Sequence, residues 1–386
     1  MQTACKMRCL NVVLLCAGVA FVLAAPTTIS ALDARVLYDG RTVRTNDTVD
    51  FDWVGVGARL RVDGASWVTA QFRTQPGARG TRFRVYASDQ AFGRYPVATL
   101  WVAPPPFLAE GGDANIVNVT LFTGFSASSR DLSLYNIVAP QYGTGVTSFV
   151  SFSTDGTFAA PAASARRIEF VGDSITAATN VERPRGAPHC GDGGLQSDWS
   201  QTYEALLCAA FDASCSTVAV GGKCMVERCE GLQMPDYYVG SLYSDAPRDT
   251  FDFPTAAAPD AVVIHLGTND YARGGDSALD AEFAKTTLAF MQNATRRWAR
   301  DDIEFFLPTG PMTSASRNGT MQALALAKSA GIKATWIDMT LACTNLPWDA
   351  GNPDGCDGCA SHPGVEGHKK MFEAAQPVIA QVMRWL

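Results

Sequence analysis

The chain has 386 residues, of which 47% are hydrophobic and 18% charged, so it can bury a sizeable core, and its length favours two domains over one. Its formal net charge is −7, and it contains no run of Lys or Arg. This leaves no electrostatic footprint for nucleic acid or for an anionic membrane, whereas small neutral or polymeric substrates remain compatible with the composition.

Residues 1–25 have the layout of a secretory signal peptide. Two basic residues, Lys6 and Arg8, precede an apolar run of about 16 residues, and small residues and a proline come after it. The run is shorter than the roughly 20 residues that a membrane-spanning helix needs. We therefore predict cleavage near Ala24 or Ala25 and a secreted, extracellular protein without membrane attachment; the alternative is an uncleaved anchor.

The cysteines agree with this location. Three of the 11 cysteines lie inside the predicted signal peptide, and the remaining eight all follow residue 189. An even number in a secreted protein predicts disulfide bonds, although eight cysteines allow 105 pairings. The "CDGC" stretch at 356–359 could instead form a redox or zinc pair, but no second such pair and no suitably spaced histidines accompany it. We therefore predict disulfides, no metal site and no cofactor.

Four triplets fit the acceptor for N-glycosylation, at Asn46, Asn118, Asn293 and Asn318.

The first part of the mature chain is rich in β-strand signals. Short runs of Val, Phe, Tyr and Thr, such as "WVTAQFRT" and "ANIVNVTLFTG", alternate with Gly, Pro and Asp clusters. This pattern predicts an antiparallel β-sandwich domain over 32–158. The small residues of "FAAPAASA", at 158–165, then indicate a linker.

After the linker, strands alternate with helices. Parallel strands need helical crossovers, so this order predicts a three-layer α/β domain over 166–386 with a five-stranded parallel sheet. The predicted strands lie at 167–171, 216–220, 261–266, 303–307 and 333–338. The predicted helices lie at about 199–212, 279–299, 319–330 and 365–386. Ligands of open parallel sheets bind at the carboxyl ends of the strands, so functional residues should follow the strands.

Polar groups do follow these strands. The first strand ends in "GDSIT", which presents Ser174 at a tight turn, although a lone Gly-Asp-Ser could simply cap the next helix. The second strand is followed by "GGKC", where Gly222 offers a backbone N–H, and the third by "LGTND", where Asn269 offers an amide. The stretch "DGCDGCASHPGVEGH" supplies His362. A nucleophile, two further hydrogen-bond donors and a base are the set that an acyl-transfer site requires.

In this order, "GDSIT", "GGK", "GTND" and "SHP" resemble the four blocks of the SGNH (GDSL-like) hydrolases. The preceding stretches "FDWVGVGARLRVDG" and "GFSASSRDLSLYNIV" resemble the N-terminal jelly roll of carbohydrate esterase family 2, acetyl esterases that act on plant polysaccharides. "GGKCMVERCEGLQMPDYY" is similar to that family's Ser-Gly-Lys-Gly and Met-Pro stretches. The resemblance covers nearly the whole mature chain. It implies a jelly-roll β-sandwich followed by an SGNH catalytic domain.

The resemblance also implies residue roles. Ser174 would be the nucleophile and His362 the general base, and the oxyanion hole would consist of the Ser174 N–H, the Gly222 N–H and the Asn269 amide. Gly221 stands where the family has a serine, so either glycine could supply that N–H. Asp173 is expected to brace the turn.

One departure concerns the histidine. The usual block has an aspartate three residues before it, but this position holds Cys359. Two orienting groups for His362 stay open: the carboxylate of Asp357, which would complete a triad, and a backbone carbonyl, which some members of the esterase family are thought to use.

The sequence also suggests roles for one tryptophan and the three remaining histidines. Trp348, on the loop that leads to His362, is the candidate substrate-binding residue because it could stack on a sugar ring, with simple packing as the alternative. His265 lies inside a predicted strand and should be a hydrogen-bonded core residue. His368 should face solvent. His189 has no companion ligands for a metal.

The strand-end residues predict an acyl-transfer enzyme. The resemblance implies, more narrowly, a carboxylic ester hydrolase that removes O-acetyl or other short acyl groups from hydroxyls of polysaccharides or oligosaccharides through an acyl-enzyme. The first alternative is an esterase or lipase that acts on lipids or other small esters. The second is a carbohydrate-binding protein with an inactive hydrolase domain, because Cys359 replaces the usual acid. The sequence makes no prediction of the oligomeric state.

Overall fold

The computed structural model describes residues 25–75, 78–88, 98–102, 116–123, 129–182, 193–226, 228–344 and 356–385. Residues 1–24 of the predicted signal peptide lie outside these ranges. Within them, no helix is both long enough and apolar enough to cross a membrane.

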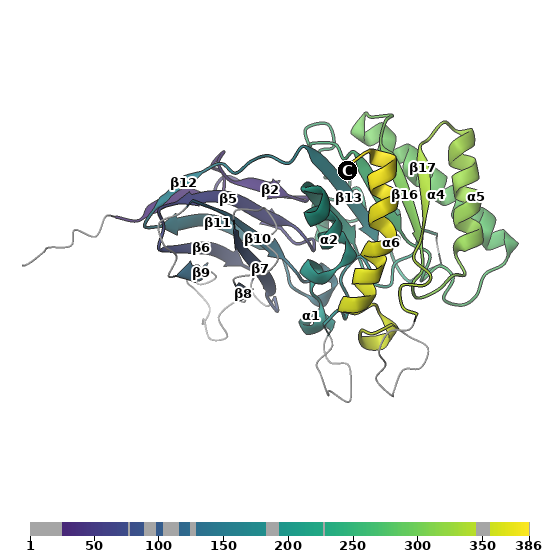
Figure 1. The fold of residues 1–386 in the computed structure, drawn as a ribbon, viewed down its shortest axis with the longest axis horizontal. Helices are drawn as coiled ribbons and strands as arrows, with labels where there is room; N and C mark the ends of the chain where they lie inside the picture. Colours follow the sequence, from purple (N-terminus) through teal and green to yellow (C-terminus); the bar gives the residue numbers. More distant parts are fainter. Residues whose placement is uncertain are drawn as a thin grey trace, which may run out of the picture.

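Two antiparallel sheets form the N-terminal part of the molecule (Figure 1). Their strands are β1 Thr27–Ser30, β2 Leu37–Asp39, β3 Val43–Arg44, β4 Val49–Phe51, β5 Gly57–Asp63, β6 Trp67–Thr74, β7 Thr81–Ser88, β8 Ala98–Val102, β9 Ile116–Thr123, β10 Arg130–Asn136, β11 Thr147–Thr154 and β12 Thr157–Ala159. One sheet has the order β3-β4-β11-β6-β9 with β1 beside β11, and the other has the order β12-β5-β10-β7-β8 with β2 beside β5. This confirms the predicted sandwich.

The alternation along β6 explains why these strands form two packed layers. Val68, Ala70 and Phe72 are buried, while the residues between them reach the outer face. The ring of Phe72 stacks on Phe83 of the other sheet with centroids 5.1 Å apart. Burying one such side chain stabilises the fold by roughly 1.5–3 kcal/mol.

A parallel sheet with helices on both faces forms the C-terminal part (Figure 1). Its strands are β13 Arg166–Gly172, β14 Ala213–Ala219, β15 Ala261–His265, β16 Glu304–Thr309 and β17 Ala334–Asp338, in the order β14-β13-β15-β16-β17. The longer helices are α2 Tyr203–Phe211, α4 Ser277–Trp298, α5 Arg317–Ser329 and α6 Val365–Met383. The short elements are η1 Pro140–Tyr142, α1 Gly193–Gln196, η2 Trp199–Gln201, α3 Met234–Tyr237, η3 Tyr243–Asp245 and η4 Cys359–Ser361. The predicted five-stranded sheet is confirmed.

The inner strands β13, β15 and β16 of this sheet are buried on both faces. In β13, Ile168 and Phe170 belong to the core formed with α2 and α6, whereas Val171 belongs to the core formed with α4 and α5. Such strands read as continuous apolar runs, which is why the sequence identified them. The second strand, β14, begins at Ala213, three residues before its predicted start at 216, because small residues paired with β13 gave little hydrophobic signal.

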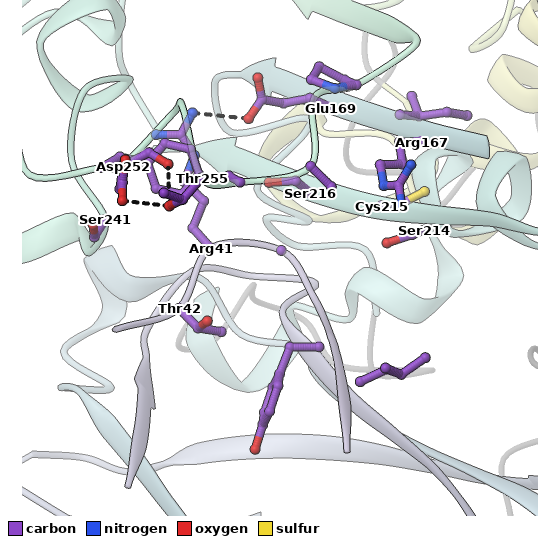
Figure 2. A pocket seen from close by; sticks show the side chains of 18 of the residues that line it. Arg41, Thr42, Arg167, Glu169, Ser214, Cys215, Ser216, Ser241, Asp252 and Thr255 are labelled. Carbon is purple, nitrogen blue, oxygen red and sulfur yellow. Dashed lines mark hydrogen bonds and ion pairs between the residues drawn. The ribbon is translucent and has the colours of Figure 1, made fainter. Parts of the chain in front are cut away.

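A buried ion pair joins the sandwich to the parallel sheet. Arg41, between β2 and β3, reaches Glu169 of β13 at 3.0 Å, and their side chains are only 1% and 2% exposed (Figure 2). The Arg41 guanidinium also lies 4.2 Å from the centre of the Phe251 ring. These residues border a cavity of about 630 Å³ at the amino-terminal halves of β13 and β14. The two parts are thus held together on the sheet edge opposite to Ser174.

The disulfide prediction is confirmed for the described cysteines. Cys208 pairs with Cys215, Cys224 with Cys229 and Cys343 with Cys356, and Cys359 is also disulfide-bonded. The cysteines of "CDGC" therefore do not pair with each other. The domain boundaries at 32–158 and 166–386 stay predictions.

Candidate active site

Ser174 lies on a tight turn directly after β13. A Cβ on Gly172 would come within 2.1 Å of Thr176 Oγ1, so only glycine fits at the end of this strand. The carboxylate of Asp173 accepts the backbone N–H of Ile175 at 3.0 Å and braces the turn, as expected. The Ser174 residue is 8% exposed.

The imidazole of His362 contacts this serine. Its Nε2 lies 2.8 Å from Ser174 Oγ, and its Nδ1 lies 3.0 Å from the carbonyl oxygen of Ala360. A carbonyl oxygen can only accept a hydrogen bond, so Nδ1 carries the proton and Nε2 is free to accept the serine proton. Burial lowers the pKa of His362 from its usual value, which favours this neutral form.

The turn before His362 places the carbonyl oxygen of Ala360 within hydrogen-bond distance of His362 Nδ1. Ala360 and Ser361 adopt positive φ angles of 49° and 63°, a conformation that costs on the order of 1–3 kcal/mol for a residue other than glycine. Two hydrogen bonds hold the turn: the Gly358 N–H donates to His362 O at 2.9 Å, and the Cys359 N–H donates to Asn180 O at 3.2 Å. The second bond ties the histidine loop to the loop that carries Ser174.

Asp357 lies elsewhere than the triad hypothesis requires. Its carboxylate accepts the backbone N–H groups of Gly364 at 2.8 Å, Gly367 at 3.0 Å and Glu366 at 3.1 Å. These are unpaired N–H groups at the start of α6, where a negative charge is favourable. Asp357 therefore caps the helix, and of the two orienting groups left open by the sequence, it is the backbone carbonyl that faces His362 Nδ1.

The amide of Asn269 reaches the same edge of the sheet after β15. Its Nδ2 donates to Asp173 Oδ2 at 3.1 Å and to the carbonyl of Lys223 at 3.0 Å. The Asp173 side chain is fully buried, and burial raises the pKa of its carboxyl to about 7. Asp173 thus links the turn of Ser174 to the amide of Asn269.

Both candidate glycines lie beside these groups, after β14. A Cβ on Gly221 would lie 3.6 Å from Ser174 Cβ, so the backbone passes close to the serine at this point. Gly222 has a positive φ of 76° and shares with Asn269 a hollow of about 220 Å³. Each glycine remains a candidate donor to an oxyanion.

Two of the other histidines are buried. His265 is 2% exposed and bonds to Gly310 O at 2.6 Å through Nε2, so the prediction of a hydrogen-bonded core residue is confirmed. The prediction that His368 faces solvent is wrong: it is fully buried, and its Nδ1 accepts the Tyr203 N–H at 3.3 Å. His368 shares the buried face of α6 with Met371 and Ala375, and this face packs on the sheet.

Trp348 and His189 lie outside the described residues. Among the described ones, no group of three or more His, Cys, Asp or Glu is placed to hold a metal ion. Sequence reasoning did not single out Ala360, because a backbone carbonyl leaves no side-chain signal. It also missed Gln141 of η1, whose amide packs against Gly221.

A serine hydroxyl in contact with a neutral imidazole, with amide donors beside it at the carboxyl ends of three parallel strands, is the arrangement of an acyl-transfer hydrolase. Residues 170–370 match the model of the GDSL-like lipase/acylhydrolase family, slightly more than half of the chain. The chain belongs to this family, and it is a carboxylic ester hydrolase.

Similarity extends to named relatives. The chain is 21% identical over 381 residues to an acetylxylan esterase / glucomannan deacetylase from Cellvibrio japonicus, covering 96% of this chain and 95% of the relative. It is 28% identical over 211 residues to the cellulase/esterase CelE from Acetivibrio thermocellus, covering 54% of this chain but only 24% of the relative. The fold is similar to that of a family two carbohydrate esterase from Clostridium thermocellum in complex with cellohexaose, with a TM-score of 0.73, 22% identity and coverage of 91% of this chain and 100% of the other.

Proposed function

We propose that this protein is a secreted serine esterase that removes O-acetyl groups from hydroxyls of polysaccharides or oligosaccharides. The observation that carries the proposal is the 2.8 Å contact between His362 Nε2 and Ser174 Oγ. The substrate class is supported by the relative named an acetylxylan esterase / glucomannan deacetylase and by the similar esterase solved with cellohexaose. The signal-like N-terminus and the disulfides support secretion.

In the first half of the proposed reaction, Ser174 Oγ attacks the acetyl carbonyl carbon while His362 Nε2 takes the hydroxyl proton. The Ala360 carbonyl accepts the Nδ1–H, so it keeps the ring oriented and stabilises the imidazolium that forms. The new oxyanion accepts hydrogen bonds from the Ser174 N–H, from the N–H of Gly221 or Gly222, and from the Asn269 amide. To make this last bond, the Asn269 amide gives up its hydrogen bond to the backbone carbonyl of Lys223.

Collapse of the tetrahedral intermediate breaks the bond between the carbonyl carbon and the sugar oxygen. His362 gives its proton to that oxygen, the sugar leaves as an alcohol, and acetyl-Ser174 remains. A water molecule then attacks the acetyl group and gives a proton to Nε2. The second collapse returns that proton to Ser174 Oγ and releases acetate. The cycle needs only the ester and water, and it proceeds through a Ser-His dyad without a carboxylate.

The donor set gives the proposal a quantitative consequence. Losing one oxyanion donor typically costs about 100- to 1,000-fold in turnover, so Asn269→Ala should lower kcat by that factor and leave residual activity. Asn269 also holds the Asp173 carboxylate, and circular dichroism of the variant checks that the fold is intact.

Substrate comparison tests the proposed function. We expect acetate release from acetylated xylan or glucomannan, and a preference for acetyl over long-chain p-nitrophenyl esters. A preference for long acyl chains would contradict the sugar assignment and favour a lipase. Binding of acetylated xylan without any release of acetate would instead favour a carbohydrate-binding protein with an inactive hydrolase site.

A further inference from the structure

Charged side chains line the hollow of about 220 Å³ that lies beside the candidate oxyanion donors. Gly222 and Asn269 form one part of its wall, and Arg228, Glu230 and Arg273 form another part. All five residues border one space, so a single ligand can contact them together. A group that occupies the hollow therefore lies next to the donors that are proposed to bind the ester carbonyl oxygen.

The three charged side chains have no partner within the part of the protein that the structure describes. No hydrogen bond or ion pair of the described residues involves the two guanidinium groups or the carboxylate of Glu230. All three residues are exposed. Each guanidinium offers N–H groups that only donate, and the carboxylate offers oxygens that only accept. The wall thus presents both kinds of hydrogen-bonding group to whatever enters the hollow.

The backbone of the loop that carries two of these side chains is held in place. A disulfide joins Cys224 to Cys229 within this loop, and Cys229 itself borders the hollow. The Met225 N–H donates to Asp270 Oδ1 at 2.9 Å, which ties the loop to the residue that follows Asn269. A loop fixed in this way needs little rearrangement when a ligand binds, and this lowers the cost of binding.

The size and polarity of the hollow limit the group that can fill it. Its volume is below the roughly 300–1,000 Å³ of pockets for drug-sized ligands, so it suits one small group. An alkyl chain would displace water from the charged side chains without replacing the hydrogen bonds, which is unfavourable. A sugar hydroxyl can accept from a guanidinium and donate to a carboxylate. In an acetyl ester of a sugar, only the sugar carries hydroxyls.

We propose that Arg228, Glu230 and Arg273 form the subsite for the sugar ring that carries the acetyl group. The two guanidinium groups donate to hydroxyl oxygens of the ring, and the Glu230 carboxylate accepts a hydrogen bond from one of its hydroxyls. The ester carbonyl oxygen then faces the oxyanion donors. This inference rests on the proposed function and deepens it, because it names the residues that select a sugar ester over another ester of the same acid.

Three variants and two matched controls test the subsite. Arg228→Met and Arg273→Met keep an unbranched side chain and remove the guanidinium, and Glu230→Gln removes the negative charge. Arg73→Met on β6 and Glu373→Gln on α6 make the same changes at other exposed positions. Each protein is assayed on acetylated xylohexaose and on p-nitrophenyl acetate, which has no sugar. The readout is the ratio of the two kcat/KM values.

We expect each subsite variant to lower this ratio about tenfold, mainly through a higher KM for acetylated xylohexaose, because one hydrogen bond from a charged group to the sugar is lost. The nitrophenyl group has no hydroxyl for these side chains to bind. Both controls should keep the wild-type ratio. All variants should unfold at the wild-type temperature, because the subsite side chains have no partner in the described part of the protein.

Several outcomes would overturn the inference. A wild-type ratio in all three variants would remove these side chains from sugar binding, and a higher ratio in Glu230→Gln would show that its carboxylate repels the substrate. Equal losses on both substrates with a lower unfolding temperature would assign the side chains to the fold. If the wild type deacetylates xylohexaose in any of these cases, only the subsite fails. A wild type that hydrolyses p-nitrophenyl acetate but no acetylated sugar would refute the proposed function itself.

Discussion

The Asp357 carboxylate caps α6, and its replacement by alanine separates capping from catalysis. The side chain accepts three backbone N–H groups of the first helical turn at 2.8 to 3.1 Å. Removal of an N-cap costs about 0.5–2 kcal/mol, and loss of a negative charge at a helix N-terminus adds about 0.3–1 kcal/mol. With three donors left unmet, Asp357→Ala should lower the free energy of unfolding by about 2 kcal/mol.

Catalysis should respond much less to this change. Removing the charge of an orienting acid from a hydrolase triad lowers kcat about 10,000-fold, whereas His362 here is held by the Ala360 carbonyl. We therefore expect kcat of Asp357→Ala on p-nitrophenyl acetate to fall less than about tenfold, a bound set by small shifts of the histidine loop.

The assay combines urea unfolding with steady-state kinetics well below the unfolding transition. Asp276→Ala is the matched control, because Asp276 caps α4 through a single bond to the Leu279 N–H at 2.9 Å. The control should lose about 1 kcal/mol of stability and no activity. A loss of kcat near 10,000-fold in Asp357→Ala, with the fold intact, would refute a Ser174–His362 dyad and favour a triad completed by Asp357.

Three further predictions follow from the same contacts. Burial lowers the pKa of His362, and this base must be neutral to take the serine proton. The kcat/KM value should therefore fall on acidification with a midpoint below pH 6.5. A midpoint above pH 6.5 would contradict the effect of burial. Asp173→Asn should lower kcat about 10- to 100-fold, because the N–H groups of Ile175 and Asn269 bind different oxygens of Asp173 and an amide has only one oxygen. An unchanged kcat would show that this link is dispensable. Arg41→Met should lower the free energy of unfolding by about 3–5 kcal/mol, because the buried carboxylate of Glu169 loses its cation. Arg73→Met, which breaks an exposed ion pair, should cost only about 0–1 kcal/mol. Equal losses in urea unfolding would refute this distinction.

The sequence singled out Ser174 because it directly follows a legible strand, and His362 because "SHP" resembles the last of the four family blocks. Buried parallel strands are continuous apolar runs, so the residues that follow them can be read directly. Since the carboxyl ends share one edge of the sheet, groups 188 residues apart were expected to meet, and Ser174 Oγ and His362 Nε2 do so.

The role of Asp357 could not be settled from the sequence. An acid a few residues before a histidine and a helix fits an orienting role and a capping role equally well. The turn that decides between them uses positive φ angles at Ala360 and Ser361, and neither residue signals such a conformation as a glycine would.

His368 was a different kind of error, because the signal was present. His368, Met371, Ala375 and Ile379 recur at helical spacing and are all buried against the sheet. A histidine on that stripe should have been assigned to the core. Gln141, by contrast, approaches Gly221 only because the sandwich docks on the parallel sheet, and local patterns contain no information on that contact.

Active-site labelling with an organophosphonate tests the central claim most directly. An activated serine hydroxyl attacks the phosphorus, and tandem mass spectrometry locates the adduct. We expect a single adduct on Ser174, none in Ser174→Ala, and a greatly slowed reaction in His362→Ala. An adduct on another residue, or labelling of His362→Ala at the wild-type rate, would contradict the pairing of this serine with this histidine.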